Sequence, residues 1–253
     1  MFWTTAWRKR GAASRRRRMQ PDAPPLARRV AAEGLGSFFL FACVIGSGIT
    51  AQNLSRGNDA VALLGNTLAT GAILFVLITM LGPISGAHMN PAVSLVAASR
   101  RELSWGDAVA YILAQFAFGI LGAWAAHLMF GLPTLQLSVK ARTGLGQWAG
   151  EFVATFGLIL TILGTVRSRR EWVPATVALY IIAAYWFTSS TSFANPAITV
   201  ARSLTNTFAG IAPRDVPPFV VAQLAGAALA AVVARYLFDP PKPPGGNAVE
   251  KSS

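Results

Sequence analysis

Two Asn-Pro-Ala triplets are the residues of this chain whose types and spacing could act directly on a small molecule. They are Asn90, Pro91 and Ala92, and Asn195, Pro196 and Ala197. Asparagine is a strong N-cap and proline is favoured at the first helical position, so each triplet predicts the start of a helix. If the side-chain oxygen caps its helix, the NH₂ group is left free to donate to a passing solute. A helix start also carries about half a positive elementary charge. Two starts that face each other would therefore repel cations and favour the oxygen of a neutral solute.

Glu33 and Glu151 are the only acids in the interior of long apolar stretches. A carboxylate in a membrane is costly and points first to a functional role. Two interpretations remain open: a proton relay, and a scaffold in which each carboxylate accepts hydrogen bonds from backbone N–H groups of a buried loop. The presence of one such acid in each half of the chain favours the scaffold. No nucleophile–base pair and no set of metal ligands is recognisable, so we expect no enzyme, metal or cofactor.

The elements that must position these residues are membrane helices. The chain has 253 residues, of which 53% are hydrophobic and 13% charged, whereas about a quarter of an average soluble domain is charged. Five long stretches are almost free of charge and a sixth lies around 147–166; the five are 30–55, 60–99, 108–139, 172–201 and 216–234. A helix needs roughly 20 apolar residues to cross the hydrocarbon core. The composition therefore predicts an all-α membrane protein with six transmembrane helices.

The net charge of +12 is distributed in a way that argues against nucleic-acid binding. With six crossings, 17 of the 22 Lys and Arg residues fall on the side of the termini. This asymmetry is the positive-inside rule and predicts two cytoplasmic termini. The basic segment before residue 28 is then expected to lie against anionic lipid headgroups. The first 18 residues are open to a second interpretation, an extension upstream of an initiator at Met19.

The chain repeats itself in opposite orientation. Residues 32–38 are echoed by 150–156, 88–94 by 193–199, and 111–115 by 219–223. Each half has three crossings, so the second half enters the membrane from the opposite face and pairs its elements with the first around a central site. The expected divisions are a cytoplasmic segment 1–28, a first repeat 29–135 with a half-helix at 90–99, a connecting loop 136–147, a second repeat 148–238 with a half-helix at 195–204, and a disordered tail 239–253.

The stretch 60–99 is too long for one crossing and too short for two complete ones. Its surplus contains Gly82, Pro83 and Gly86, which break helices, and then Asn90-Pro91. We therefore expect a loop that dips into the membrane and a short helix that returns to the same side. Such backbone is tolerated only where protein buries it or where it lines a wet cavity. The segment thus predicts a cavity.

These features resemble the aquaporin, or major intrinsic protein, family. Residues 86–93 and 192–197 are close to its two signature loops, and the resemblance covers about residues 28–238. It implies six transmembrane helices plus two re-entrant half-helices, a homotetramer in the lipid bilayer with one pore per subunit, and Glu33 and Glu151 as supports of the loops. It also implies a path lined by loop carbonyls, here those of Gly86, Ala87, His88, Ser190, Thr191 and Ser192. The aromatic residues near the span ends are expected to anchor at the membrane interface: Trp105, Trp148, Trp172, Tyr185, Trp186 and Tyr236.

The expected selectivity filter departs from that of water-selective family members. Those proteins resemble one another at four filter positions, which hold an aromatic residue, a His, a small residue and an Arg. Aligned without gaps from the two Asn residues, this chain has Thr70, Ala183, Ser192 and Ile198. A throat without the aromatic, the His and the Arg is predicted to be wider and more apolar, and to pass larger neutral solutes such as glycerol, urea or arsenous acid. The combination is similar to bacterial aquaporins associated with arsenic handling, which implies the bacterial cytoplasmic membrane.

Arg202 leaves two alternatives open. It lies four residues after Ile198 on the same helix face, so its head group either reaches back toward the throat or binds nearby loop carbonyls and the membrane interface. The predicted function is a passive channel for small uncharged solutes. The alternatives are a water-selective pore and, in a different class, a proton-coupled secondary transporter, which also uses inverted repeats.

Overall fold

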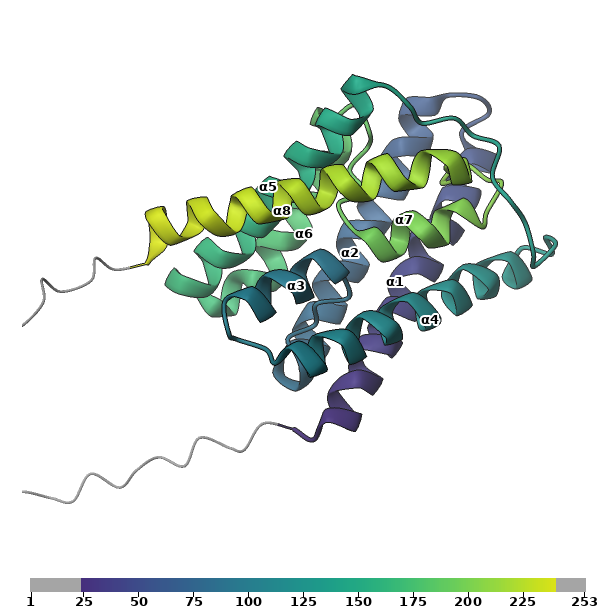
Figure 1. The fold of residues 1–253 in the computed structure, drawn as a ribbon. Helices are drawn as coiled ribbons and strands as arrows, with labels where there is room; N and C mark the ends of the chain where they lie inside the picture. Colours follow the sequence, from purple (N-terminus) through teal and green to yellow (C-terminus); the bar gives the residue numbers. More distant parts are fainter. Residues whose placement is uncertain (1–23, 240–253) are drawn as a thin grey trace, which may run out of the picture.

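A computed structural model describes residues 24–239, and these residues form a bundle of helices (Figure 1). The expectations for residues 1–23 and 240–253 lie outside this part of the chain. The helices are α1 (Leu26–Leu54), α2 (Asp59–Ser85), α3 (Pro91–Ser99), α4 (Trp105–Met129), α5 (Leu145–Ser168), α6 (Val173–Phe187), α7 (Pro196–Ser203) and α8 (Val216–Phe238). Two short 3₁₀ turns, η1 (Arg170–Trp172) and η2 (Pro213–Asp215), precede α6 and α8.

The two halves of the chain are built alike, because α1 to α4 and α5 to α8 each contain two longer helices, a short one and a further long one. In the first half α1 packs against both α2 and α4, and in the second half α5 packs against both α6 and α8. Contact between α2 and α6 joins the halves. Glycine permits the closest crossings, since an added Cβ at Gly122 would collide with the carbonyl of Phe38, and one at Gly226 with that of Phe152.

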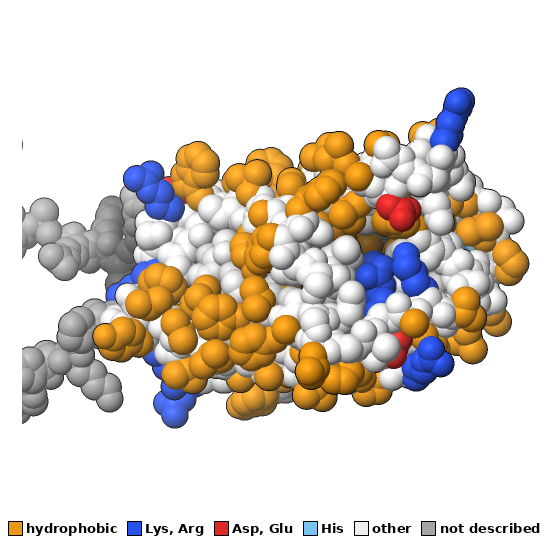
Figure 2. Space-filling view, turned by 90° about the horizontal axis from the view of Figure 1, so that it is seen from above, with side chains coloured by type: hydrophobic (Ala, Val, Ile, Leu, Met, Phe, Trp, Pro, Cys, Tyr) orange, Lys and Arg blue, Asp and Glu red, His pale blue; other side chains and the backbone are white. Residues whose placement is uncertain are grey.

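Five of the helices, α1, α2, α4, α5 and the η2–α8 segment, are long and apolar enough to cross a membrane. Helix α6 has 15 residues, or about 22 Å at 1.5 Å per residue, which is shorter than the hydrocarbon core of about 30 Å. The sixth crossing is therefore short, and the chain continues from it into non-helical residues 188–195, most of which are buried. Figure 2 shows hydrophobic side chains spread over the middle of one face and basic side chains gathered toward its two ends.

Ion pairs at one end and a loop contact at the other define two sides of the bundle. On the terminal side, Arg29 at the start of α1 pairs with Asp107 at the start of α4 at 2.9 Å, and Arg100 pairs with Asp239 after α8 at 3.3 Å. On the distal side, the loop between α4 and α5 crosses the end of α7, where Ser138 N–H donates to the Ser203 carbonyl at 2.9 Å. The half-helices lie between these sides: α3 packs on α4 and α8, and so does α7.

Candidate functional site

The two Asn-Pro-Ala triplets begin the two half-helices. Asn90 Oδ1 accepts from the Ala92 N–H at 2.9 Å, and Asn195 Oδ1 accepts from the Ala197 N–H at 2.9 Å and from that of Ile198 at 3.3 Å. Pro91 and Pro196 occupy the first helical positions. The local physics is that of an N-cap followed by a residue that needs no N–H partner.

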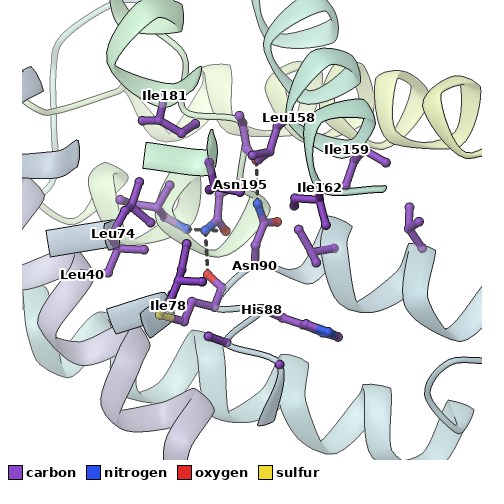
Figure 3. A pocket seen from close by; sticks show the side chains of 18 of the residues that line it. Leu40, Leu74, Ile78, His88, Asn90, Leu158, Ile159, Ile162, Ile181 and Asn195 are labelled. Atoms are coloured by element: carbon purple, nitrogen blue, oxygen red, sulfur yellow. Dashed lines mark hydrogen bonds between the residues drawn. The ribbon is translucent and has the colours of Figure 1, made fainter. Parts of the chain in front are cut away.

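The two asparagines also connect the halves of the molecule (Figure 3). Asn90 Nδ2 donates to the Ala194 carbonyl at 2.8 Å, and Asn195 Nδ2 donates to the Met89 carbonyl at 2.8 Å. An amide NH₂ has two N–H groups. One of them on each side chain is therefore committed to the opposite loop, which corrects the expectation that the whole NH₂ group is free for a solute.

The loops before the half-helices have matching and unusual backbones. Ala87 and Ser192 lie three residues before the two asparagines with φ of 49° and 48°, and Met89 and Ala194 lie one residue before them with φ of 48° each. Residues other than glycine adopt this left-handed region only at a cost. Something outside the loops must therefore hold them in place.

Glu33 and Glu151 are the groups that hold these loops. The Glu33 carboxylate accepts from the N–H groups of His88 at 2.8 Å and Met89 at 2.6 Å. The Glu151 carboxylate accepts from those of Phe193 at 2.8 Å and Ala194 at 2.9 Å. Both acids are fully buried. Their oxygens bond N–H donors that have no helical partner, which is the arrangement of a scaffold.

Two glutamines that the sequence analysis left without a role complete this scaffold. Gln115 Nε2 donates to Glu33 at 2.9 Å and to Ser94 Oγ at 3.1 Å. Gln223 Nε2 donates to Thr199 Oγ1 at 2.8 Å and to Glu151. The repeat of residues 111–115 in 219–223 contained the signal, because a glutamine ends both stretches. Each half thus ties an acid, a third long helix and a half-helix together through one amide.

A cavity of about 210 Å³ runs past the two asparagines. Its wall is mostly aliphatic, as Figure 3 shows around Asn90 and Asn195, and the labelled apolar residues are Leu40, Leu74, Ile78, Leu158, Ile159, Ile162 and Ile181. The two loops contribute residues 86–90 and 192–195 to the wall, and its other polar residues are Thr70, Glu102, Arg170, Tyr185 and Arg202. Gly86, Ala87 and His88 line the cavity as expected, whereas Ser190 and Thr191 do not. The loop after α6 enters the cavity two residues later than expected, at Ser192.

Of the four expected filter residues, Thr70, Ser192 and Ile198 line the cavity and Ala183 does not. Ala183 is exposed on α6 and faces away from the bundle. Tyr185, two residues later, lines the cavity instead; it is 3% exposed and its hydroxyl lies 3.4 Å from Thr70 Oγ1. This corrects two expectations, because an aromatic side chain lines the cavity beside Thr70 and Tyr185 is not an interface anchor.

Arg202 reaches the cavity and also binds a loop carbonyl, so both alternatives hold in part. It is 2% exposed, lines the cavity and donates from Nε to the Ala209 carbonyl. Its guanidinium carbon lies 3.4 Å from the ring centre of Phe193. A second arginine, Arg142 of the connecting loop, lies over the same ring at 5.0 Å. No motif in the sequence singled out Arg142.

Comparison with known proteins agrees with this geometry. The family profile described as Major intrinsic protein matches residues 22–192. The chain is 57% identical over 218 residues to aquaglyceroporin AqpS of Rhizobium meliloti, covering 86% of this chain and 93% of that protein. It is 33% identical over 248 residues to aquaporin AqpM of Methanothermobacter thermautotrophicus, covering 84% and 98%. The X-ray structure of the aquaglyceroporin from Plasmodium falciparum superposes with a TM-score of 0.67 at 19% identity, over 85% of this chain and 96% of that one, which shows the shared fold.

The paired half-helices, the loops they support and the profile match lead to one assignment. The chain belongs to the major intrinsic protein family and is a multi-span membrane channel for small neutral solutes rather than an enzyme.

Proposed function

We propose that this channel passively conducts neutral solutes larger than water, namely glycerol-like polyols, urea and trihydroxy metalloid acids such as arsenous acid or its methylated forms, together with water. The observation that carries the proposal is the residue at position 198 of the cavity wall. Water-selective members of the family resemble one another in having an arginine at this position, whereas this chain has Ile198. An isoleucine there offers no donor fork and no fixed charge.

The two-sided wall of the cavity supports this solute class. The carbon skeleton of a polyol can pack on the aliphatic side chains of α2, α5 and α6. Its hydroxyl groups need partners on the other side, because a polar group buried without a hydrogen bond costs free energy. The loop backbones, the second N–H of each asparagine and the Ser192 hydroxyl, which is buried without a partner, supply them.

Tyr185 limits how wide the throat can be. Its ring restores part of the bulk that Thr70 alone would leave open, and its hydroxyl adds a polar group beside Thr70. A three-carbon polyol or a compact trihydroxy acid suits such a throat better than a sugar does. The printed name of the relative AqpS, an aquaglyceroporin, supports the same solute size.

A coupled transporter is the weaker candidate. The carboxylate oxygens of Glu33 and Glu151 accept hydrogen bonds from backbone N–H groups and glutamine amides, so the two acids do not form a proton relay with each other. A water-selective pore would require the distal arginines to narrow the throat. Passive conduction of larger neutral solutes therefore remains the proposal.

The setting is also part of the proposal: a homotetramer in a bacterial cytoplasmic membrane, with both termini in the cytoplasm. The terminal side carries, at helix ends and in the turns that follow them, Arg100, Arg101, Arg167, Arg169 and Arg170. This bias, and the bacterial origin of AqpS, support that orientation and that membrane.

Flux into proteoliposomes tests the solute class. The purified protein is reconstituted, and uptake of water, glycerol, urea and arsenite is followed with and without an imposed pH gradient. We expect uptake of all four solutes at rates above those of empty vesicles and independent of the gradient. Uptake that requires the gradient would favour the transporter, and a pore that passes water alone would favour the water-selective alternative.

A further inference from the structure

The distal mouth of the channel holds two guanidinium groups that form no ion pair with a carboxylate in the described part of the chain, although the Asp215 carboxylate accepts from the Arg142 backbone N–H at 2.8 Å. Within residues 24–239 the ion pairs are those of Arg29 with Asp107 and of Arg100 with Glu102 and Asp239. Neither Arg142 nor Arg202 takes part. Burying an ion without a counter-ion costs several kcal/mol by the usual order of magnitude, so this pair of residues requires an explanation.

Loop carbonyls and one aromatic ring hold the two guanidinium groups. Arg142 donates from Nε to the Gly210 carbonyl at 2.9 Å and from Nη1 to the Ser190 carbonyl at 3.3 Å. Arg202 donates from Nε to the Ala209 carbonyl, and both groups lie over the ring of Phe193. These contacts fix the positions of the two cations, but neutral carbonyls and a ring do not cancel two charges.

The arrangement leaves donors without acceptors. Arg202 Nη1 is buried and has no partner, and the same is true of Ser192 Oγ. Both residues line the cavity. Buried polar atoms in proteins nearly always have a partner, and an orphan pair at the mouth of a cavity points to a ligand that supplies the acceptors.

We propose that Arg142 and Arg202, with Ser192, form a binding site for a small planar oxyanion such as a carboxylate at the distal mouth. A planar anion with two oxygens matches the guanidinium fork. The anion stops there, because the wall beyond it is aliphatic and would strip its hydration without compensation. A bound anion therefore occupies the entrance and slows neutral solutes, so the site makes the channel sensitive to organic acids.

Formate binding to the purified protein in detergent tests the site without relying on transport. The melting temperature is measured against formate concentration, with chloride at equal ionic strength as the reference, since a ligand that binds the folded state raises it. We expect a saturable rise for the wild type. In Arg202→Gln and Arg142→Gln the half-saturating concentration should increase at least roughly tenfold, the loss of one charge-assisted hydrogen bond. Arg214→Gln, an exposed arginine on the same side, is the matched control and should match the wild type.

Arg142→Lys keeps the charge without the fork and serves if Arg142→Gln does not fold. Its half-saturating concentration should rise about threefold or more. An absent formate effect in the wild type, or unchanged binding in Arg202→Gln and Arg142→Lys, would overturn the proposal.

A second arm rests on the proposed function and uses glycerol uptake into proteoliposomes. External formate should inhibit uptake through the wild type and through Arg214→Gln, and much less through Arg202→Gln. If formate binds in detergent but glycerol does not pass at all, the site stands and the solute class fails. If glycerol passes and formate neither binds nor inhibits, the solute class stands and the site fails.

Discussion

Asn90 donates a hydrogen bond to the carbonyl of Ala194, a residue of the opposite loop, at 2.8 Å. Asn195 returns the same bond to Met89. The asparagines therefore do two jobs, because each also caps its own half-helix. The two side chains that join the loops also line the cavity, so changes there should affect both stability and selectivity.

Asn90→Asp separates these two jobs. Aspartate is also a strong N-cap, but it cannot donate to the Ala194 carbonyl and it places a negative charge in the cavity. We expect a loss of about 1–3 kcal/mol, the cost of an unsatisfied buried acceptor, and a measurable leak of K⁺. Melting in detergent and ion conductance check the two effects. Asn90→Ala should destabilise without producing the leak, and an equal leak in both variants would contradict the assignment.

Glu151→Gln tests the scaffold. A glutamine amide has a single acceptor oxygen, so the N–H groups of Phe193 and Ala194 could not both be satisfied as they are now. We expect a destabilisation of about 1–3 kcal/mol and reduced uptake of glycerol that is the same with and without a pH gradient. Glu171→Gln, an exposed acid on the terminal side, is the control and should behave as the wild type. A loss of uptake seen only under the gradient would point to a proton relay.

Tyr185 should limit the size of the solute. Tyr185→Ala removes the ring from the cavity wall beside Thr70, so uptake of the four-carbon polyol erythritol relative to glycerol should rise. Erythritol is larger by one CHOH group, and a tight site discriminates roughly tenfold even for one extra methylene, so we expect a rise of about that size. The ratio of radiolabelled erythritol uptake to radiolabelled glycerol uptake into proteoliposomes measures this. Ala183→Phe changes an exposed position on the same helix and should leave the ratio unchanged. The opposite pattern would restore Ala183 to the filter.

The contrast between Ala183 and Tyr185 shows where sequence reasoning stopped. The repeat and the charge-free stretches predicted the spans, the half-helix starts and the terminal-side bias, because hydrophobic length and capping are local properties. The register between α6 and Asn195 was not readable, since residues 188–195 form a loop whose path is set by Glu151 and not by any local pattern. An ungapped count back from Asn195 therefore selected Ala183, whereas the residue that faces the cavity is Tyr185, two positions later.

Arg142 illustrates a second limit. It lies in a loop between the two halves and meets Gly210, Ser190 and Phe193, which are distant in the sequence. Loop–loop contacts of this kind have no periodic signal. Gln115 and Gln223 are different, because their repetition was visible and only their partners were not.

Lys140 should make the stability of the distal loop depend on pH. Partial burial, followed by the charges of Arg142 on its own loop and Arg202 on α7, lowers the pKa of Lys140 to about 8, against a smaller opposing effect of Asp59. Above that pH the folded protein carries a neutral Lys140 while the unfolded chain still binds the proton, so stability should rise with pH from about 8 upward. Below pH 8 this contribution is absent, and the partly desolvated charged lysine lowers the free energy of unfolding.

Melting temperatures between pH 7 and 9 measure this effect, in the wild type and in Lys140→Gln. Arg142 keeps its charge over that range, because burial lowers its pKa only to about 10. The difference between the two proteins should shrink as the pH rises. A constant difference would show that Lys140 does not titrate there.

The central claim is that isoleucine in place of arginine at position 198 lets the channel admit solutes larger than water, and glycerol uptake by Ile198→Arg tests it most directly. Ile198 lines the cavity and is 5% exposed. An arginine there should reduce glycerol uptake by at least about tenfold, equivalent to roughly 1.4 kcal/mol in the barrier, with a smaller loss of water permeability, while Ile198→Leu stays near the wild type. Glycerol uptake that is unchanged by the arginine, or a wild type that never passed glycerol, would contradict the claim.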